Sequence, residues 1–196
     1  MNILRTLWVI TSFSLLGLSS SVMAGYTLNE DSSQINFISV KKNTVGEMHT
    51  LNGLSGSIDD NGQVRITISL DRVETRVPVR NERLKALFFE TSKFPLATAE
   101  IAVDIVKINT LTEGEIMNQV LSVNVDLHGV RAEIPVRVQV IGLRGHKLSV
   151  TVTEPVLLDV KDFDLLDGLT ALKTIAKLSS ISSSVPVTAQ LLFVAQ

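Results

Sequence analysis

The sequence contains no cysteine and only three histidines among its 196 residues. Without cysteine the chain has no disulfides, no thiolate metal ligands, no cysteine nucleophile and no cysteine to carry a lipid at a cleavage site. The histidines form neither a His-x-His nor a His-Glu-x-x-His pattern, so we expect no metal site. An oxidising compartment would leave such a chain chemically unchanged.

Aromatic residues and net charge are also scarce. The chain has one Trp, one Tyr and seven Phe, and 18 basic residues face 20 acidic ones, for a net charge of −2. So few aromatic rings argue against a stacking platform for sugars or single-stranded nucleic acid. The near balance of charge predicts no basic field for nucleic acid or for an anionic membrane surface. We therefore expect no nucleic-acid partner.

The first 24 residues have the pattern of a secretory signal peptide. Arg5 supplies the positive start, Leu7–Leu18 is apolar, and Val22-Met23-Ala24 offers small or tolerated residues for cleavage. The apolar stretch is about 12 residues, short of the roughly 20 that span a bilayer. We expect cleavage after Ala24, a periplasmic mature domain of residues 25–196, and no stable membrane insertion afterwards. A retained anchor helix is the alternative.

Beyond residue 24, apolar and polar residues alternate with a period of two, which is typical of strands with one face toward an apolar interior. The alternating segments are Ile35–Val40, Val64–Asp71, Ile101–Val106, Val120–Leu127, Ile134–Ile141, Leu148–Val152 and Val185–Val194. Turn sequences separate them, at Asp59–Gly62, Glu113–Gly114, His128–Gly129 and Gly142–Gly145. The sequence predicts an all-β, antiparallel sandwich or barrel.

Two segments have helical rather than alternating spacing of their apolar residues, Arg80–Glu90 and Asp167–Leu178. Pro78 precedes the first segment, and Asp167 is a suitable N-cap for the second. The sequence thus predicts one β domain that carries two short helices.

No catalytic constellation stands out. The chain has no Gly-x-Ser-x-Gly elbow and no Ser-x-x-Lys box. His49, His128 and His146 have no sequence neighbour that would orient a catalytic base, and we interpret them as strand-surface or turn residues. The acidic cluster Asp159–Asp167 lacks the spacing of a calcium loop. We predict no catalytic residue and no enzyme; an enzyme would need a histidine in a pocket, hydrogen-bonded to a carboxylate.

Arg80-Asn81-Glu82-Arg83 is the most distinctive polar stretch. In one interpretation it is a solvated helix start, in which Arg80 pairs with a nearby carboxylate at little gain in stability. In the other, Arg80 and Arg83 stand at a cavity mouth and bind an anionic head group, because the guanidinium fork suits phosphate oxygens. Spacing alone favours the first interpretation.

The order of these segments resembles the YceI-like family of bacterial secreted proteins across Gly25 to Gln196. The specific part is Arg80–Arg83 followed by Phe88-Phe89 and Lys93-Phe94-Pro95. The resemblance implies an eight-stranded, antiparallel, lipocalin-like barrel whose apolar channel holds a polyisoprenoid chain, and a periplasmic, non-enzymatic role. The chain departs from the family at Asp162-Phe163-Asp164, where a glycine is usual at the third place.

From this resemblance we expect a lipid ligand, an isoprenoid quinone or a polyprenyl chain, and no other cofactor. The candidate wall residues are Ile35, Phe37, Phe88 and Phe94, and the candidate rim residues are Arg80 and Arg83. The alternative is a stress-related periplasmic interaction or holdase-like protein with a packed barrel and no lipid, which a cavity below roughly 300 Å³ would favour. A homodimer is compatible with either function.

Overall fold

The computed structural model describes residues 25–196, so the predicted signal peptide lies outside the described residues. The strands in this part are β1 (Tyr26–Leu28), β2 (Gln34–Lys41), β3 (Val45–Leu51), β4 (Leu54–Ile58), β5 (Gln63–Ser69), β6 (Val73–Glu74), β7 (Leu96–Ala102), β8 (Ile116–Leu127), β9 (Val130–Leu143), β10 (Lys147–Val152), β11 (Val156–Asp159) and β12 (Ser184–Ala195). The helical segments are η1 (Glu30–Ser32), η2 (Leu70–Arg72), α1 (Pro78–Arg83), η3 (Leu84–Phe88), α2 (Ile105–Asn109), η4 (Val160–Phe163) and α3 (Leu166–Ile175).

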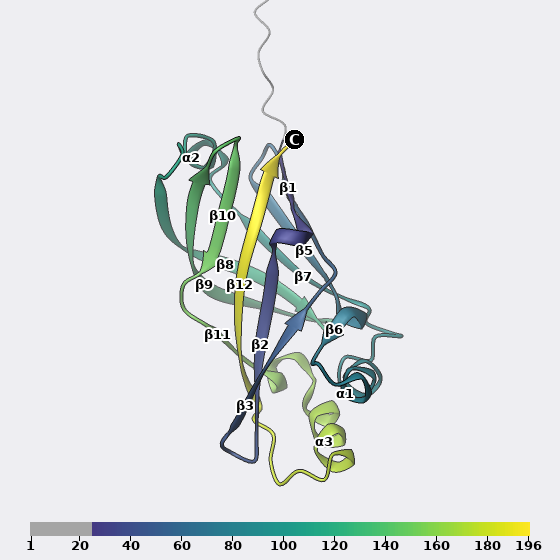
Figure 1. The fold of residues 1–196 in the computed structure, drawn as a ribbon. Helices are drawn as coiled ribbons and strands as arrows, with labels where there is room; N and C mark the ends of the chain where they lie inside the picture. The colour runs from purple at the N-terminus through teal and green to yellow at the C-terminus, as the bar shows by residue number, and fades with distance from the viewer. Residues whose placement is uncertain (1–24) are drawn as a thin grey trace, which may run out of the picture.

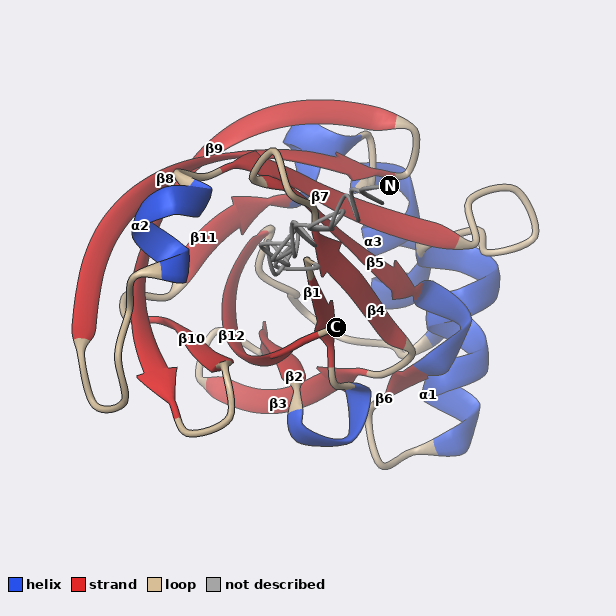
Figure 2. Cartoon of the chain, turned by 90° about the horizontal axis from the view of Figure 1, so that it is seen from above, coloured by secondary structure: helices blue, strands red, loops and turns tan. Residues whose placement is uncertain are grey.

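The strands close into an antiparallel barrel of eight, which confirms the predicted fold class. The order around the ring is β1-β4-β5-β7-β8-β9-β10-β12, and the ring closes because β12 pairs with β1 as well as with β10. Figure 2, which looks along the barrel, shows this ring. Four further strands extend the sheet toward one end: β2 and β11 pair with β12, β3 pairs with β2, and β6 pairs with β3.

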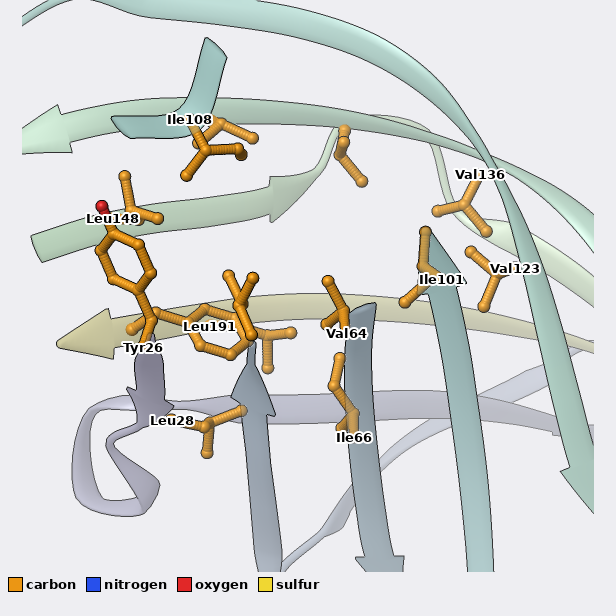
Figure 3. Packing of buried hydrophobic residues seen from close by; sticks show 14 of the residues in the cluster. Tyr26, Leu28, Val64, Ile66, Ile101, Ile108, Val123, Val136, Leu148 and Leu191 are labelled. Carbon is orange, nitrogen blue, oxygen red and sulfur yellow. The ribbon is translucent and has the colours of Figure 1, made fainter. Parts of the chain in front are cut away.

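Alternate residues of the strands point into the barrel and form one large apolar cluster. Figure 3 shows how its side chains face one another across the interior, among them Tyr26, Leu28, Val64, Ile66, Ile101, Ile108, Val123, Val136, Leu148 and Leu191. Full burial of each such side chain contributes about 1.5–3 kcal/mol. The cluster therefore supplies much of the free energy that closes the barrel.

Helix α2 covers the end of the barrel that carries the C-terminus (Figure 1). Its Ile108 is buried in the apolar cluster, and the Tyr26 hydroxyl donates a hydrogen bond to Asn109 Oδ1 at 3.0 Å. The prediction of a strand over Ile101–Val106 was wrong beyond β7, because Asp104 caps α2: its Oδ1 accepts a hydrogen bond from the Lys107 backbone amide. A helix of five residues is too short to show a period.

The other end of the barrel carries α1, η3 and α3 (Figure 1). Both predicted helical segments are confirmed, although Asp167 is not the N-cap of α3: the helix begins at Leu166 and Asp167 lies in its first turn. There the carboxylate still faces the positive end of the helix dipole. Gly168 lets α3 approach η3, since a Cβ at this position would lie 2.6 Å from the Leu87 carbonyl oxygen.

In residues 25–196 no helix has both the length and the apolar character needed to cross a membrane.

Candidate functional site

A cavity of about 590 Å³ lies inside the barrel. Aliphatic side chains of the strands make most of its wall, including Ile66, Ala99, Leu121, Val138, Val150 and Ala189. Its volume falls within the range of about 300–1,000 Å³ that is usual for small-molecule sites. Side chains therefore do not fill this barrel completely, and the space that remains suits an apolar ligand.

Five of the six candidate ligand residues line this cavity. Ile35 and Phe37 belong to β2, Phe88 to η3, and Arg80 and Arg83 to α1. Phe94 is not among the lining residues. Its ring centroid lies 4.3 Å from that of His128, and a Cβ at Gly129 would lie 3.0 Å from the ring, so Phe94 packs on the turn between β8 and β9.

Polar side chains gather where the cavity meets α1. Lys41 Nζ and Arg80 Nη1 both contact Glu47 Oε2, at 2.8 Å and 2.7 Å. The hydrogen bond from Lys41 and the positive charge of Arg80 hold the pKa of Glu47 below its usual value. The Glu47 carboxylate is therefore ionised at neutral pH and links β2, β3 and α1.

Arg80 and Asn81 also fasten α1 to the segment that follows β6. Arg80 Nη2 donates to the Thr75 carbonyl oxygen at 2.6 Å, and Asn81 Oδ1 accepts hydrogen bonds from the Thr75 amide and hydroxyl. Arg80 thus pairs with a carboxylate, as expected if Arg80–Arg83 were a solvated helix start, but this pair lies at the cavity wall. Arg83, the other candidate rim arginine, lines the cavity and has no carboxylate within 4 Å among residues 25–196.

His49 lies in the cavity wall, so its interpretation as a strand-surface or turn residue was wrong. The pairing of β2 with β3 sets His49 opposite Phe37, inside the barrel, where it is 3% exposed. Nε2 lies 2.8 Å from Ser39 Oγ, whereas Nδ1 is buried without a hydrogen-bond partner in the described residues. Burial, assisted by the positive charge of Arg80, lowers the pKa of His49 to about 4.

In the described part of the chain, no histidine both lines the cavity and is hydrogen-bonded to a carboxylate, which is the arrangement expected of an enzyme. His49 lies in the cavity, but its partner is Ser39. His128 is hydrogen-bonded to a carboxylate, with Nε2 3.2 Å from Glu90 Oε2, but it does not line the cavity. Residues 25–196 also hold no group of three His, Asp or Glu side chains placed to bind a metal ion.

The buried His49 should make the protein less stable in acid. The imidazole has a pKa of about 6.5 in the unfolded chain and about 4 in the folded protein. Well above pH 6.5 it is neutral in both states, and between about pH 6.5 and pH 4 mainly the unfolded chain takes up a proton. The free energy of unfolding should therefore fall by up to about 1.4 kcal/mol per pH unit in this window. Urea unfolding between about pH 7 and pH 5 measures the slope.

His49→Gln should reduce this pH dependence, because the variant lacks the titrating group. His146→Gln is the matched control, since His146 is exposed in the turn between β9 and β10. Equal pH slopes for wild type and His49→Gln would contradict the assignment.

Comparison with known proteins supports a family assignment. The family model for the YceI-like domain matches residues 26–193. A polyisoprenoid-binding domain from Saccharophagus degradans, implicated in plant cell wall breakdown, is 35% identical, with a TM-score of 0.86 over 87% of this chain and 98% of that one. No curated protein matches the sequence.

Two further solved structures share the fold at 16% identity. BcnA of Burkholderia cenocepacia has a TM-score of 0.63, over 84% of this chain and 98% of its own. The Campylobacter jejuni YceI protein has a TM-score of 0.54, over 76% and 84%. The family model spans nearly all of the described residues, and the structure reproduces the barrel of these relatives, so this chain belongs to the YceI-like family.

Proposed function

We propose that this protein binds a polyisoprenoid-type lipid, an isoprenoid quinone or a polyprenyl chain, and carries or sequesters it in the periplasm without changing it chemically. The apolar cavity of about 590 Å³ is the observation on which this proposal depends. The 35% identical relative named as a polyisoprenoid-binding domain supports the ligand class. The signal-peptide pattern of residues 1–24 supports the periplasmic location.

The apolar wall of the cavity predicts that affinity for a prenol increases with the length of its hydrocarbon chain. Each buried methylene group contributes about 0.8 kcal/mol, so ten carbons supply about 8 kcal/mol and twenty about 16 kcal/mol. Association costs about 4–15 kcal/mol in lost freedom of motion. A ten-carbon prenol therefore gains little net affinity, whereas a twenty-carbon prenol gains enough for stable binding.

Head-group recognition falls to the polar end of the cavity. Arg83 lines the wall with no carboxylate within 4 Å in the described residues, and the buried His49 Nδ1 has no hydrogen-bond partner there. A neutral imidazole can donate to a carbonyl or accept from a hydroxyl, according to its tautomer. A polar head group at this end would satisfy an atom that the protein alone leaves unpaired.

The packed-barrel alternative, a holdase-like protein without a lipid, has less support. It requires an interior filled by side chains, whereas the cavity is about twice the roughly 300 Å³ below which it would be favoured.

A chain-length series tests the proposal. The purified protein is titrated with geraniol, farnesol and geranylgeraniol, and bound lipid is detected by native mass spectrometry and by solvent extraction. We expect no retained geraniol and stoichiometric geranylgeraniol, because affinity grows with the apolar surface buried. No retention of geranylgeraniol, of an isoprenoid quinone or of any lipid from the host cell would overturn the proposal.

A further inference from the structure

Three segments that line the cavity meet at one of its ends, and we call them together the mouth: 41–47, 74–87 and 166–182. Each segment contributes to the cavity wall, for example through Lys41, Val79 and Ala176. They also contact one another: the Lys42 amide donates to the Ser180 carbonyl oxygen at 3.0 Å, and Arg80 pairs with Glu47. The mouth lies at the end of the barrel away from α2 and the C-terminus (Figure 1).

The mouth carries apolar side chains that face solvent. Six of them are between 36% and 56% exposed: Val45, Val77, Val79, Leu87, Leu166 and Ile175. They come from all three segments. Single exposed apolar residues are ordinary on a protein surface, but a set arranged around one opening is typical of an interaction surface.

The three mouth segments are rich in positive charge, and the adjoining residues 159–165, with one basic and three acidic residues, still leave this end of the barrel positive. The mouth contains eight basic and four acidic residues, a net charge of +4, whereas the rest of residues 25–196 contains nine basic and sixteen acidic residues, a net charge of −7. The near-zero charge of the whole chain therefore hides a strong asymmetry, which arises because the fold brings three separate segments together.

Ion pairing sharpens this asymmetry. Of the nine basic residues outside the mouth, eight lie within 4 Å of a carboxylate, and in the described residues only Lys147 does not. Of the eight mouth residues, five have no such partner in the same part of the chain: Lys42, Arg76, Arg83, Lys173 and Lys177. Unpaired cations therefore surround the apolar opening.

We propose that the mouth docks on the surface of an anionic lipid bilayer. The exposed apolar side chains enter the interface, and the unpaired lysines and arginines bind lipid phosphates. This arrangement sets the cavity opening against the bilayer, so that an apolar ligand passes between the two without crossing water. The inference goes beyond the proposed function, because it stands whatever apolar ligand the cavity holds.

Vesicle co-sedimentation tests the proposal with the full mature chain. Vesicles of phosphatidylethanolamine and phosphatidylglycerol are compared with vesicles of phosphatidylcholine alone. We expect binding to the anionic vesicles at least about tenfold tighter than to the neutral ones, and release at high salt, because screening weakens attraction between exposed charges.

Paired variants locate the docking face. Lys173→Glu with Ile175→Glu changes α3 at the mouth, at residues that do not line the cavity. Lys147→Glu with Val106→Glu is the matched control near α2, because it also replaces one unpaired lysine and one exposed apolar residue. We expect the mouth pair to weaken vesicle binding at least about tenfold and the control pair to leave it within about twofold.

Geranylgeraniol binding separates this proposal from the proposed function. Both pairs should retain it, which also shows that they fold. If the mouth pair does not fold, the single exposed variant Lys42→Glu replaces it. No binding to either vesicle, equal binding to both, or equal loss in the mouth and control pairs would overturn membrane docking, and would leave an acidic protein surface as the partner that fits this face.

Discussion

Filling the cavity should abolish lipid binding while the fold survives. Ala99 of β7 and Ala189 of β12 both line the cavity, and four steps separate their strands in a ring of eight, so the two strands lie on opposite sides of the barrel. Phenylalanine at both positions places two rings where the lipid chain would lie. If the ligand loses room for about four carbons, affinity falls by about 3 kcal/mol, or more than about a hundredfold.

The double variant should not lose stability through overpacking, since its new rings enter empty space. Circular dichroism and urea unfolding check that the barrel is intact, and native mass spectrometry with geranylgeraniol measures binding. Ala102→Phe is the matched control, because Ala102 lies on the same strand but is exposed to solvent. Undiminished lipid binding by the double variant would show that the ligand lies elsewhere.

Most strands of the barrel were predictable from alternation, although β1, β4 and most of β7 were not, and neither was the closure of the ring. Alternation reveals which faces are apolar, and the turns between segments reveal where chains reverse. Closure depends on β12 pairing with β1 and β2 along one edge and with β10 and β11 along the other. A period of two carries no information about such long-range partners, so only the family resemblance favoured a barrel over a sandwich.

Part of the cavity lining was predictable, including the aliphatic Ile35, whereas His49 and most of the aliphatic wall were not, and Phe94 lies outside the cavity. Arg83, Phe37 and Phe88 stand out by residue type, and they line the cavity. Leu121 and Val138 do not stand out, because a packed core and an empty channel both need apolar walls. His49 was missed because its side of β3 is set by register; the Phe37 opposite it was the available signal.

Phe163→Ala should have the largest effect on stability among the variants considered, a loss of about 3–5 kcal/mol in the free energy of unfolding. Phe163 is 2% exposed and forms a buried cluster with Val160 and Leu165, at the end of η4. The next residue, Asp164, adopts the left-handed conformation with φ of 56°, which glycine adopts most readily and aspartate tolerates better than most residues. This turn directs Leu165 back into the cluster.

The same substitution should leave lipid binding intact, because Phe163 also lines the cavity and its removal enlarges the space. A domain has only about 5–15 kcal/mol of stability in total, so urea unfolding will show the loss clearly. Phe94→Ala is the matched control: its ring is half-buried outside the cavity, and we expect a smaller loss. If Phe163→Ala unfolded like the wild type, η4 would be a surface feature rather than a part of the wall. If instead it lost stability and lipid together, the cavity would depend on this ring for its shape, and stability and binding would not be separable at this end of the barrel.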